Sequence, residues 1–504
     1  MAVKKPTHLF GSSVSRREFL HKSLARGAAV ALGGWACSGK KMPSSDAHPN
    51  LLVVVTDQMS GQVLGFSDRN LAFTPNLARF ARQSVVFSQA VSNYPLCSPS
   101  RGMLMTGKYP HSHHVLNNCH SGSAKYGYEL GISERCWSDV LKDNGYSLGY
   151  IGKWHLESPK KPYVDSPEKS GGLIWNEWCP PGRRHGFDFW YANNTSLHHL
   201  TPVYWATDTP RDKAFTIHEW GPIHEADLAV RYVHNEDGRF RDSKKPWALV
   251  VSMNPPHPPY GEVPQRYVEM YGDKDLEELC QRPNIPPADQ KWGKFYRKHI
   301  KNYLAAISGV DEQFGRILEA LRTAGTETET IVVFLSDHGN CLGIHNQGSK
   351  NNHYEEAMRI PLLIRWPDKI SAGQDDSLIS MPDICPSLLD LMGFKEDVPD
   401  EVEGASFAPL LRGGGYKRPT SQLYLRVPLG KPSWGRRGVR THTHTLVISK
   451  MPDSPKATML HDNVNDPYQL VNSAEAQPDL VRRLVEEELN PWLDKTGDPW
   501  LNNP

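Results

Sequence analysis

The amino-acid sequence predicts an α/β protein with a mixed, mostly parallel sheet sandwiched by helices, followed by a small C-terminal α+β subdomain. Continuous apolar runs, such as 51–55 and 247–253, are typical of strands buried on both faces of a parallel sheet. Segments with helical periodicity separate these runs, as in strand–helix–strand units. The 504 residues, 38% of them hydrophobic, are enough for a large core.

The overall charge favours neither nucleic acid nor a membrane as a partner. Lysine and arginine total 57 against 56 acidic residues, which gives a formal net charge of +1. The eight cysteines are scattered without CxxC spacing, so they exclude a zinc ribbon and show no disulfide framework. Local charge must therefore supply any substrate recognition, and the oligomeric state stays open.

Residues 1–37 are predicted to be an export signal rather than part of the fold. Residues 15–20 form a twin-arginine pattern, and the apolar run at 27–36 is too short for a transmembrane span. We therefore expect a periplasmic or cell-surface protein. Lipidation of Cys37 is a less favoured alternative, because Gly34 stands where lipoprotein signals usually carry leucine.

The main elements follow in order from residue 50. Strands are predicted at 51–55, 84–91, 146–151, 247–253 and 330–335, and helices at 74–83, 137–142, 223–236 and 295–324, the last broken near Gly309. Residues 156–219 lack strong periodicity and are rich in Pro, Gly, Trp and His, which predicts an extended insertion. Long loops in compact domains are usually functional.

The domain boundaries come from changes in composition near the C-terminus. The catalytic domain is expected to span 50–395, and an Asp-, Glu-, Pro- and Gly-containing linker to span 396–419. Residues 420–504 are expected to form the α+β subdomain, with strands at 423–427 and 445–448 and a final helix at 480–488.

Potential ligands or catalytic groups follow four of the predicted strands directly. They are Asp57, Lys153 with His155, His257, and Asp337 with His338. In an open α/β sheet, sites form at the carboxyl edge, where parallel strands end. One such coincidence would mean little, but four of them predict a common site.

The segment 97–101, Cys-Ser-Pro-Ser-Arg, is a polar turn that leads into a predicted helix. Ser98 is expected to be the N-cap, with Pro99 at the first helical position. Cys97 would then lie at the positive end of the helix dipole, beside Arg101. This is a favourable place for a negative charge.

This pentapeptide resembles the Cys-x-Pro-Ser-Arg signature of type I sulfatases, which belong to the alkaline phosphatase superfamily. The resemblance continues over most of the chain through 152–155 (Gly-Lys-Trp-His), 256–258 (Pro-His-Pro), Lys350, 354–356, 359–361, 460–462 and 466–467. Within this family, the sequence resembles the polysaccharide-desulfating branch more than the arylsulfatases.

The resemblance implies an alkaline-phosphatase-like fold and hydrolysis of sulfate esters. A maturation enzyme would convert Cys97 to formylglycine, whose hydrate is the nucleophile. The implied metal ligands are Asp57, Gln58, the modified Cys97, Asp337 and His338. The implied catalytic groups are Cys97, Arg101 to steady the modified residue, Lys153 and Lys350 at the sulfate oxygens, His257 as proton donor and His155 as base.

Two positions depart from the commonest family pattern. Gln58 and His338 stand where aspartate and asparagine are frequent. The pairing resembles that of choline sulfatases and phosphonate monoester hydrolases of the same superfamily. Two carboxylates make a less anionic cage than three, and an imidazole nitrogen makes Mn²⁺ plausible beside the expected Ca²⁺.

Substrate binding is expected from the insertion. It carries Trp175, Trp178, Trp190, Tyr191, Tyr204, Trp205 and Trp220, together with His198 and His199, and His345 is a further candidate near Lys350. The aromatic rings fit either a sulfated glycan or simple packing of the loop, with equal weight. The sequence does not identify the sugar or the carbon that carries the sulfate.

The sequence is compatible with three functions. A carbohydrate sulfatase is preferred. A phosphonate monoester hydrolase, phosphodiesterase or choline-type sulfatase on the same scaffold is favoured by Gln58 and His338 alone. A non-catalytic sulfoglycan-binding protein would require Cys97 to stay unoxidised.

Overall fold

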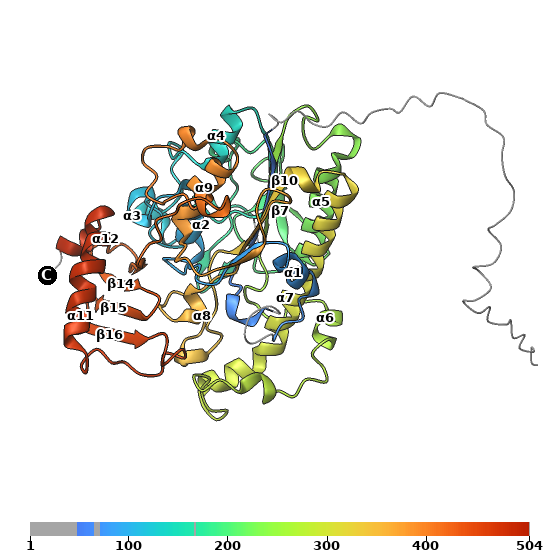
Figure 1. Ribbon diagram of the computed structural model, residues 1–504. Coiled ribbons are helices and arrows are strands. Elements are labelled where there is room, and N and C mark those ends of the chain that lie inside the picture. The colour runs from blue at the N-terminus through green and yellow to red at the C-terminus, as the bar shows by residue number, and fades with distance from the viewer. Residues whose placement is uncertain (1–47, 65–70, 166–167, 503–504) are drawn as a thin grey trace, which may run out of the picture. The chain divides into compact units, whose positions relative to one another are not determined.

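The computed structural model describes residues 48–64, 71–165 and 168–502 (Figure 1). The expected export signal and Cys37 lie outside the described residues. No helix in the described part of the chain is long and apolar enough to cross a membrane.

The main sheet has ten strands within the described residues. In spatial order they are β12 (Gly373–Asp375), β2 (Val85–Phe87), β11 (Leu362–Arg365), β10 (Thr330–Ser336), β1 (Asn50–Thr56), β9 (Trp247–Met253), β3 (Ser147–Lys153), β6 (Phe189–Asn193), β7 (Val203–Ala206) and β8 (Phe215–Thr216). The central strands β10, β1, β9, β3 and β6 are parallel to one another. Antiparallel β11 and β7 flank them, which makes the sheet mixed as expected.

Both faces of this sheet are covered by helices, and the side chains of β1 show why. Leu51, Val53 and Val55 belong to one hydrophobic cluster, whereas Leu52 and Val54 belong to the other. Because successive side chains of a strand point to opposite faces, an all-apolar strand supplies two cores at once. Helices α2 (Cys97–Thr106), α4 (Trp137–Asp143) and α9 (Ile384–Leu391) cover the first face, and α1 (Pro75–Ala81), α5 (Gly221–His234) and α7 (Lys291–Thr323) the second (Figure 1).

The C-terminal part forms a separate antiparallel sheet. Its elements are β13 (Gln422–Arg426), β14 (Gly435–Arg440), β15 (His444–Lys450), β16 (Ala457–Asp462), α11 (Pro478–Leu484) and α12 (Asn490–Lys495). The remaining short elements are α3 (Pro110–His113), α6 (Gln265–Glu269), α8 (Glu355–Met358), α10 (Ala408–Leu411), β4 (Lys169–Ser170) and β5 (Leu173–Ile174). Helix α10 lies within the expected linker 396–419, and its Ala408 and Leu411 are buried in the same core as α9.

The structure corrects the sequence predictions for one helix and for the insertion. The expected helix break near Gly309 is wrong, because α7 runs unbroken from Lys291 to Thr323. A side chain at Gly309 would meet the ring of Trp220 at 2.5 Å, so this glycine makes room for a neighbour within the helix. The insertion is also more regular than expected, since β6, β7 and β8 extend the main sheet from it.

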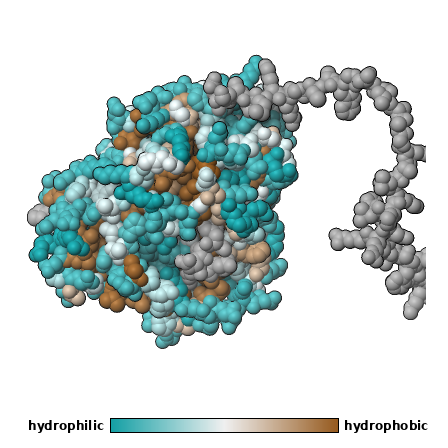
Figure 2. Space-filling model, viewed as in Figure 1, coloured by the Kyte–Doolittle hydropathy of each residue, from teal (hydrophilic) through white to brown (hydrophobic). Residues whose placement is uncertain are grey.

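The surface agrees with this division of side chains. On the face seen in Figure 2, hydrophilic residues cover most of the surface and apolar residues are exposed in patches between them. The apolar strands and helix faces described above are buried.

Glu225 of α5 is a buried carboxyl group packed against β3. Its side chain is 2% exposed, and one oxygen accepts a hydrogen bond from the Tyr204 hydroxyl at 2.9 Å. The other oxygen has no partner among the described residues. Burial raises the pKa of Glu225 to about 8.

This pKa makes stability depend on pH. A glutamate in the unfolded chain ionises near its ordinary pKa, whereas folded Glu225 resists ionisation. The folded state therefore binds more protons between the two pKa values, and stability falls as pH rises through this window. Relative to Glu225→Gln, the wild type should lose about 3 kcal/mol between about pH 5.5 and about pH 8.5.

Denaturant unfolding of both proteins at several pH values measures this difference. The matched control is Glu278→Gln, which changes an exposed glutamate and should show the wild-type pH profile. A stability difference between the wild type and Glu225→Gln that stays constant with pH would contradict the assignment.

Candidate active site

The carboxyl ends of four neighbouring parallel strands converge on one site. Asp57 follows β1, Lys153 ends β3, His257 lies shortly after β9, and Asp337 follows β10. The backbone N–H of Asp57 donates to the Met253 carbonyl at 3.1 Å, which ties β1 to β9 at this edge. The expectation that these strand ends share one site agrees with the geometry.

Helix α2 begins at Cys97 and brings it to the same edge. The expected cap at Ser98 is wrong, because Leu96 occupies the N-cap position and makes no side-chain cap. Instead, the Asn118 side-chain oxygen accepts the Ser98 N–H at 3.1 Å. Ser98 itself accepts the Cys119 N–H at 3.0 Å, so the two segments cap each other.

Arg101, one turn after the start of α2, joins the two carboxylates. Its guanidinium lies 3.0 Å from Asp337 and 3.4 Å from Asp57. It also donates to the Lys153 carbonyl at 2.9 Å and to the Ser252 hydroxyl at 2.7 Å. Burial alone would lower the pKa of Arg101, but Asp337 and Asp57 raise it. Arg101 is therefore a permanent cation between two buried acids.

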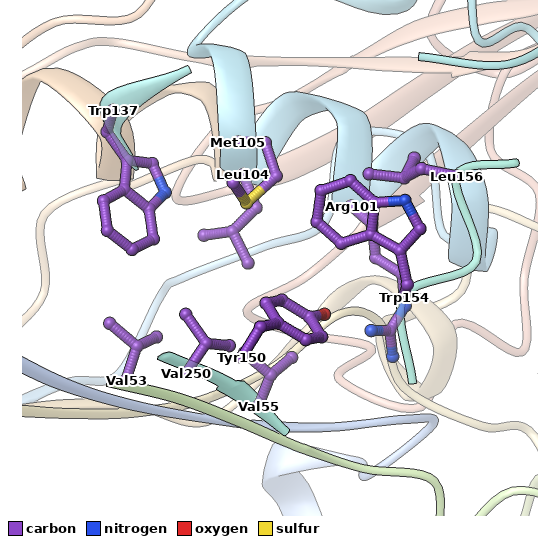
Figure 3. A pocket seen from close by; sticks show the side chains of 10 residues that line it. All are labelled: Val53, Val55, Arg101, Leu104, Met105, Trp137, Tyr150, Trp154, Leu156 and Val250. Carbon is purple, nitrogen blue, oxygen red and sulfur yellow. The ribbon is translucent and has the colours of Figure 1, made fainter. Parts of the chain in front are cut away.

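An apolar cavity lies behind this guanidinium (Figure 3). Its wall combines β1 and β9 side chains with aromatic residues, among them Trp137, Tyr150 and Trp154. The Tyr150 hydroxyl donates to the Lys153 carbonyl at 2.7 Å, next to the Arg101 contact. Such surroundings keep water away from Arg101 and strengthen its interactions with the two acids.

Two lysines place positive charge around Cys97. Lys153 lies 2.7 Å from Asp57, and Lys350 donates to the Cys97 sulfur at 2.9 Å. Burial and Asp57 would raise the pKa of the Cys97 thiol, but Lys350 and Lys153 outweigh them and lower it. Burial would also raise the pKa of Asp57, but Lys153 and Lys350 hold it well below its ordinary value. The site therefore favours negative charge at residue 97.

The donor set fits a divalent cation. Donor atoms of Asp57, Cys97, Asp337 and His338 all lie within 4.8 Å of one another. His338 faces the Gly339 carbonyl with Nδ1 at 2.9 Å, which leaves Nε2 toward the site. Gln58 has positive φ, and its buried Oε1 has no partner among the described residues. An amide oxygen without a hydrogen-bond partner, close to two carboxylates, is a suitable ligand for a hard cation.

The expected histidines divide into two groups. His155 is buried, and both of its ring nitrogens lack partners within the described residues. His257 faces the Pro258 carbonyl with Nδ1 at 2.6 Å, and desolvation, Lys350 and Lys153 lower its pKa well below the ordinary value. His199 lies near it, with ring centroids 6.5 Å apart, and burial lowers its pKa to about 3.

His198 and His345, like His199, are not among the described residues that line the pocket beside Cys97. His198 is half-exposed and lies 3.8 Å from Glu262. His345 pairs with Glu356 at 3.1 Å and stacks on Tyr354 with ring centroids 3.7 Å apart. The substrate-binding role expected of His198 and His345 stays a prediction.

Three functional neighbours were missed by sequence reasoning. Asn118 caps α2 and lines the pocket. Asn254 accepts from the Lys153 ammonium at 3.1 Å and so fixes its direction. Ser349 accepts from the Gln58 amide nitrogen and leaves the amide oxygen toward the metal donors. Asn254 directly follows β9, so the strand-end pattern held a signal for it, whereas Asn118 and Ser349 gave none.

A second group of metal-type donors has a structural explanation. Cys136, Asp139 and His185 lie close together at the start of α4. The Asp139 carboxylate accepts the Cys136 N–H at 2.9 Å and lies 3.1 Å from His185 Nδ1. These bonds form a helix cap, so we assign this group no ligand.

A pocket of about 360 Å³ lies beside Cys97. Its lining includes the charged or titratable residues Cys97, Lys153, His155, His257 and Lys350, which we call the floor. Its lining includes no carboxylate side chain among the residues that the structure describes. The arrangement can therefore bind an anion and move protons at the groups around it.

Comparisons with known proteins agree with this chemistry. The sulfatase family profile matches residues 49–394, and a profile described as N-sulphoglucosamine sulphohydrolase, C-terminal, matches residues 343–493. The chain is 36% identical over 506 residues to an endo-4-O-sulfatase from Bacteroides thetaiotaomicron, covering 92% of this chain and 96% of that protein.

Solved structures show the same relationship. A proposed sulfatase, yidJ, from Bacteroides fragilis has a TM-score of 0.88 and 44% identity, covering 92% of this chain and 99% of its own. A Bacteroides thetaiotaomicron structure from work on the metabolism of multiple glycosaminoglycans has a TM-score of 0.81 and 35% identity, covering 90% of this chain and 98% of its own.

The fold and the site together define an alkaline-phosphatase-like hydrolase that acts on the ester of an inorganic oxyacid. Because the sulfatase profile covers more than half of the chain, and a curated sulfatase matches nearly all of it, the chain belongs to the sulfatase family. It is a sulfatase.

Arg101 should be essential for the stability of the metal-free site. Arg101→Ala leaves Asp57 and Asp337 buried without their shared cation, which should cost about 3 kcal/mol or more in the free energy of unfolding. Arg101→Lys should lose part of this, because an ammonium lacks the guanidinium fork that joins two acids. Denaturant unfolding in the presence of a chelator measures both.

The matched control is Arg316→Ala. Arg316 pairs with Asp227 on the surface, so its loss should cost about 1 kcal/mol or less. Equal effects of Arg101→Ala and Arg316→Ala would show that the buried ion pairs do not stabilise this edge of the sheet.

Proposed function

We propose that this sulfatase removes sulfate from a sulfated carbohydrate through a formylglycine formed at Cys97 and a bound divalent metal. The observation that carries the proposal is the position of Cys97. It lies at a helix N-terminus, within reach of Lys350 and His338, and beside the Asp57 and Asp337 carboxylates. A site of this kind stabilises an oxyanion on the residue at position 97.

A metal would be held by Asp57, Gln58, Asp337, His338 and the modified Cys97. Carboxylate and amide oxygens suit Ca²⁺, and the imidazole nitrogen of His338 also admits Mn²⁺. When bound, the cation would neutralise charge on the sulfate oxygens and on residue 97. A formylglycine at position 97, made by a maturation enzyme, would supply a hydroxyl nucleophile as its hydrate.

The chain's own groups complete the chemistry. Lys153 and Lys350 bind the non-bridging sulfate oxygens, and Asn254 fixes the direction of Lys153. His257 holds one proton on Nδ1 against the Pro258 carbonyl, so its Nε2 gives a proton to the leaving oxygen only from the imidazolium form, which the negative charge of a bound sulfate ester would favour. His155 has two unpartnered ring nitrogens and can accept a proton at residue 97.

The charge of the pocket separates the candidate substrates. Choline carries a permanent cation, which needs a carboxylate or an aromatic cage to replace its hydration. The described lining offers two lysines and no carboxylate, which disfavours a cationic alcohol. A neutral or anionic sugar suits this environment better. The name of the endo-4-O-sulfatase relative supports a sulfated glycan, and we propose sulfate at O-4 as the first position to test.

The proposal extends to the location of the enzyme. The twin-arginine pattern at 15–20 supports export to the periplasm or cell surface, where large glycans are met. Cys37 lipidation is the alternative mode of retention there. Fractionation of cells that produce the full chain, with and without Arg16→Lys and Arg17→Lys, tests the export route.

Sulfate release from a panel of esters tests the activity. Oligosaccharides sulfated at O-4 or O-6, choline sulfate, and phosphate and phosphonate esters of matched alcohols are compared with enzyme matured in the presence of a formylglycine-generating enzyme. We expect the 4-O-sulfated oligosaccharide to react fastest. Cys97→Ala should lower kcat by at least about 10³-fold, because the nucleophile is removed.

Mass analysis of the peptide that contains Cys97 checks the modification directly. We expect an aldehyde in place of the thiol in active enzyme. Full sulfatase turnover by protein whose Cys97 is wholly unmodified would contradict the formylglycine. Faster reaction with the phosphate or phosphonate esters would favour the alternative hydrolase.

A further inference from the structure

The pocket beside Cys97 is lined by two chemically different groups of residues. Those named the floor are charged or titratable, whereas Trp175, Leu197, Pro258 and Pro259, here called the apolar side, carry no charge. In the proposed function the floor residues act on the sulfate group. The apolar side is therefore available to the alcohol part of the ester, in a cavity large enough for a sugar ring.

Trp175 is the aromatic ring on this side. It follows β5 in the insertion and is half-buried. Of the seven aromatic residues singled out in the insertion, it alone lines the pocket within the described residues. Its ring centroid lies 6.2 Å from that of His155, so the indole borders the catalytic floor directly.

The indole is fixed before any substrate arrives. Its Nε1–H donates to the Ser170 carbonyl at 3.1 Å, and its backbone N–H donates to the Glu168 carbonyl at 3.2 Å. The Trp175 carbonyl accepts from the Asn194 amide at 2.9 Å, and the ring packs against His120 with centroids 4.9 Å apart. Since its polar atom is already bonded, the ring offers substrate an apolar π surface without a large ordering cost.

We propose that Trp175 is the surface on which the sulfated sugar ring stacks while its ester group reaches the floor. One face of a pyranose presents C–H groups that pack on an aromatic ring, and its hydroxyl groups remain free for the polar residues nearby. Asn118 is one of these, since its Oδ1 is used by the Ser98 N–H while its amide nitrogen has no partner in the described part of the chain. This inference rests on the proposed carbohydrate substrate.

Kinetics of three variants test the stacking role. Trp175→Ala should lower kcat/KM for a 4-O-sulfated chondroitin oligosaccharide about tenfold, mainly through a higher KM. Trp175→Phe should retain most of the activity, because a ring remains. The matched control is Trp178→Phe, three residues along the same segment, whose indole donates to the Thr209 carbonyl and lies outside the pocket lining. It should behave as the wild type.

Each other outcome has a distinct meaning. An unchanged KM in Trp175→Ala, or equal losses in Trp175→Ala and Trp178→Phe, would overturn the stacking role. An equal fall in choline sulfate turnover would identify a cation–π site instead. If the wild type released no sulfate from any ester, the proposed function would fail on its own.

If the wild type hydrolyses no ester, a binding measurement still tests the stacking role of Trp175. Calorimetry with the same oligosaccharide compares Cys97→Ala with Cys97→Ala combined with Trp175→Ala. An affinity about tenfold weaker in the double variant supports stacking, and equal affinity overturns it.

Discussion

The buried ion pairs of Arg101 hold the site together. Asp57 and Asp337 end adjacent parallel strands, and two carboxylates so close would repel each other in an environment removed from water. Arg101 contacts both, Lys153 adds a second cation at Asp57, and Arg101 also bonds the ends of β3 and β9 through the Lys153 carbonyl and Ser252. A single guanidinium thus joins four strand ends to α2. The position of Cys97, one helical turn before Arg101, follows from this anchoring.

The parallel sheet brings the residues of the site together at one edge. Because β10, β1, β9 and β3 run in the same direction, residues far apart in the sequence meet at one edge without long loops. Gly152 shows how tightly the edge is packed, since it has φ of +98° and a side chain there would lie 2.2 Å from the Ser252 carbonyl. The side chain of the next residue, Lys153, reaches Asp57 at 2.7 Å.

Sequence patterns predicted the parts of the structure that depend on local chemistry. All-apolar runs identified β1, β9 and β10, and the polar residues directly after them predicted the site edge. Contacts between distant segments gave no such signal. Asn118 replaces Ser98 as the cap of α2 only because the fold brings it there, and Gly309 interrupts nothing because Trp220 packs against it. The partners of His345 likewise become visible only in three dimensions.

The balance of charge in the site explains why its specificity must come from elsewhere. Within the described residues, Arg101, Lys153 and Lys350 face the carboxylates Asp57 and Asp337, so the protein groups alone leave an excess of positive charge. A divalent cation would increase that excess and attract any tetrahedral oxyanion, whether sulfate or phosphate. Charge therefore selects the acid part of an ester only weakly. In the proposed function, the alcohol part of the ester meets the apolar side of the pocket, to which the insertion between β3 and β9 contributes Trp175 and Leu197. Changes in that insertion can alter the sugar while the floor keeps the chemistry.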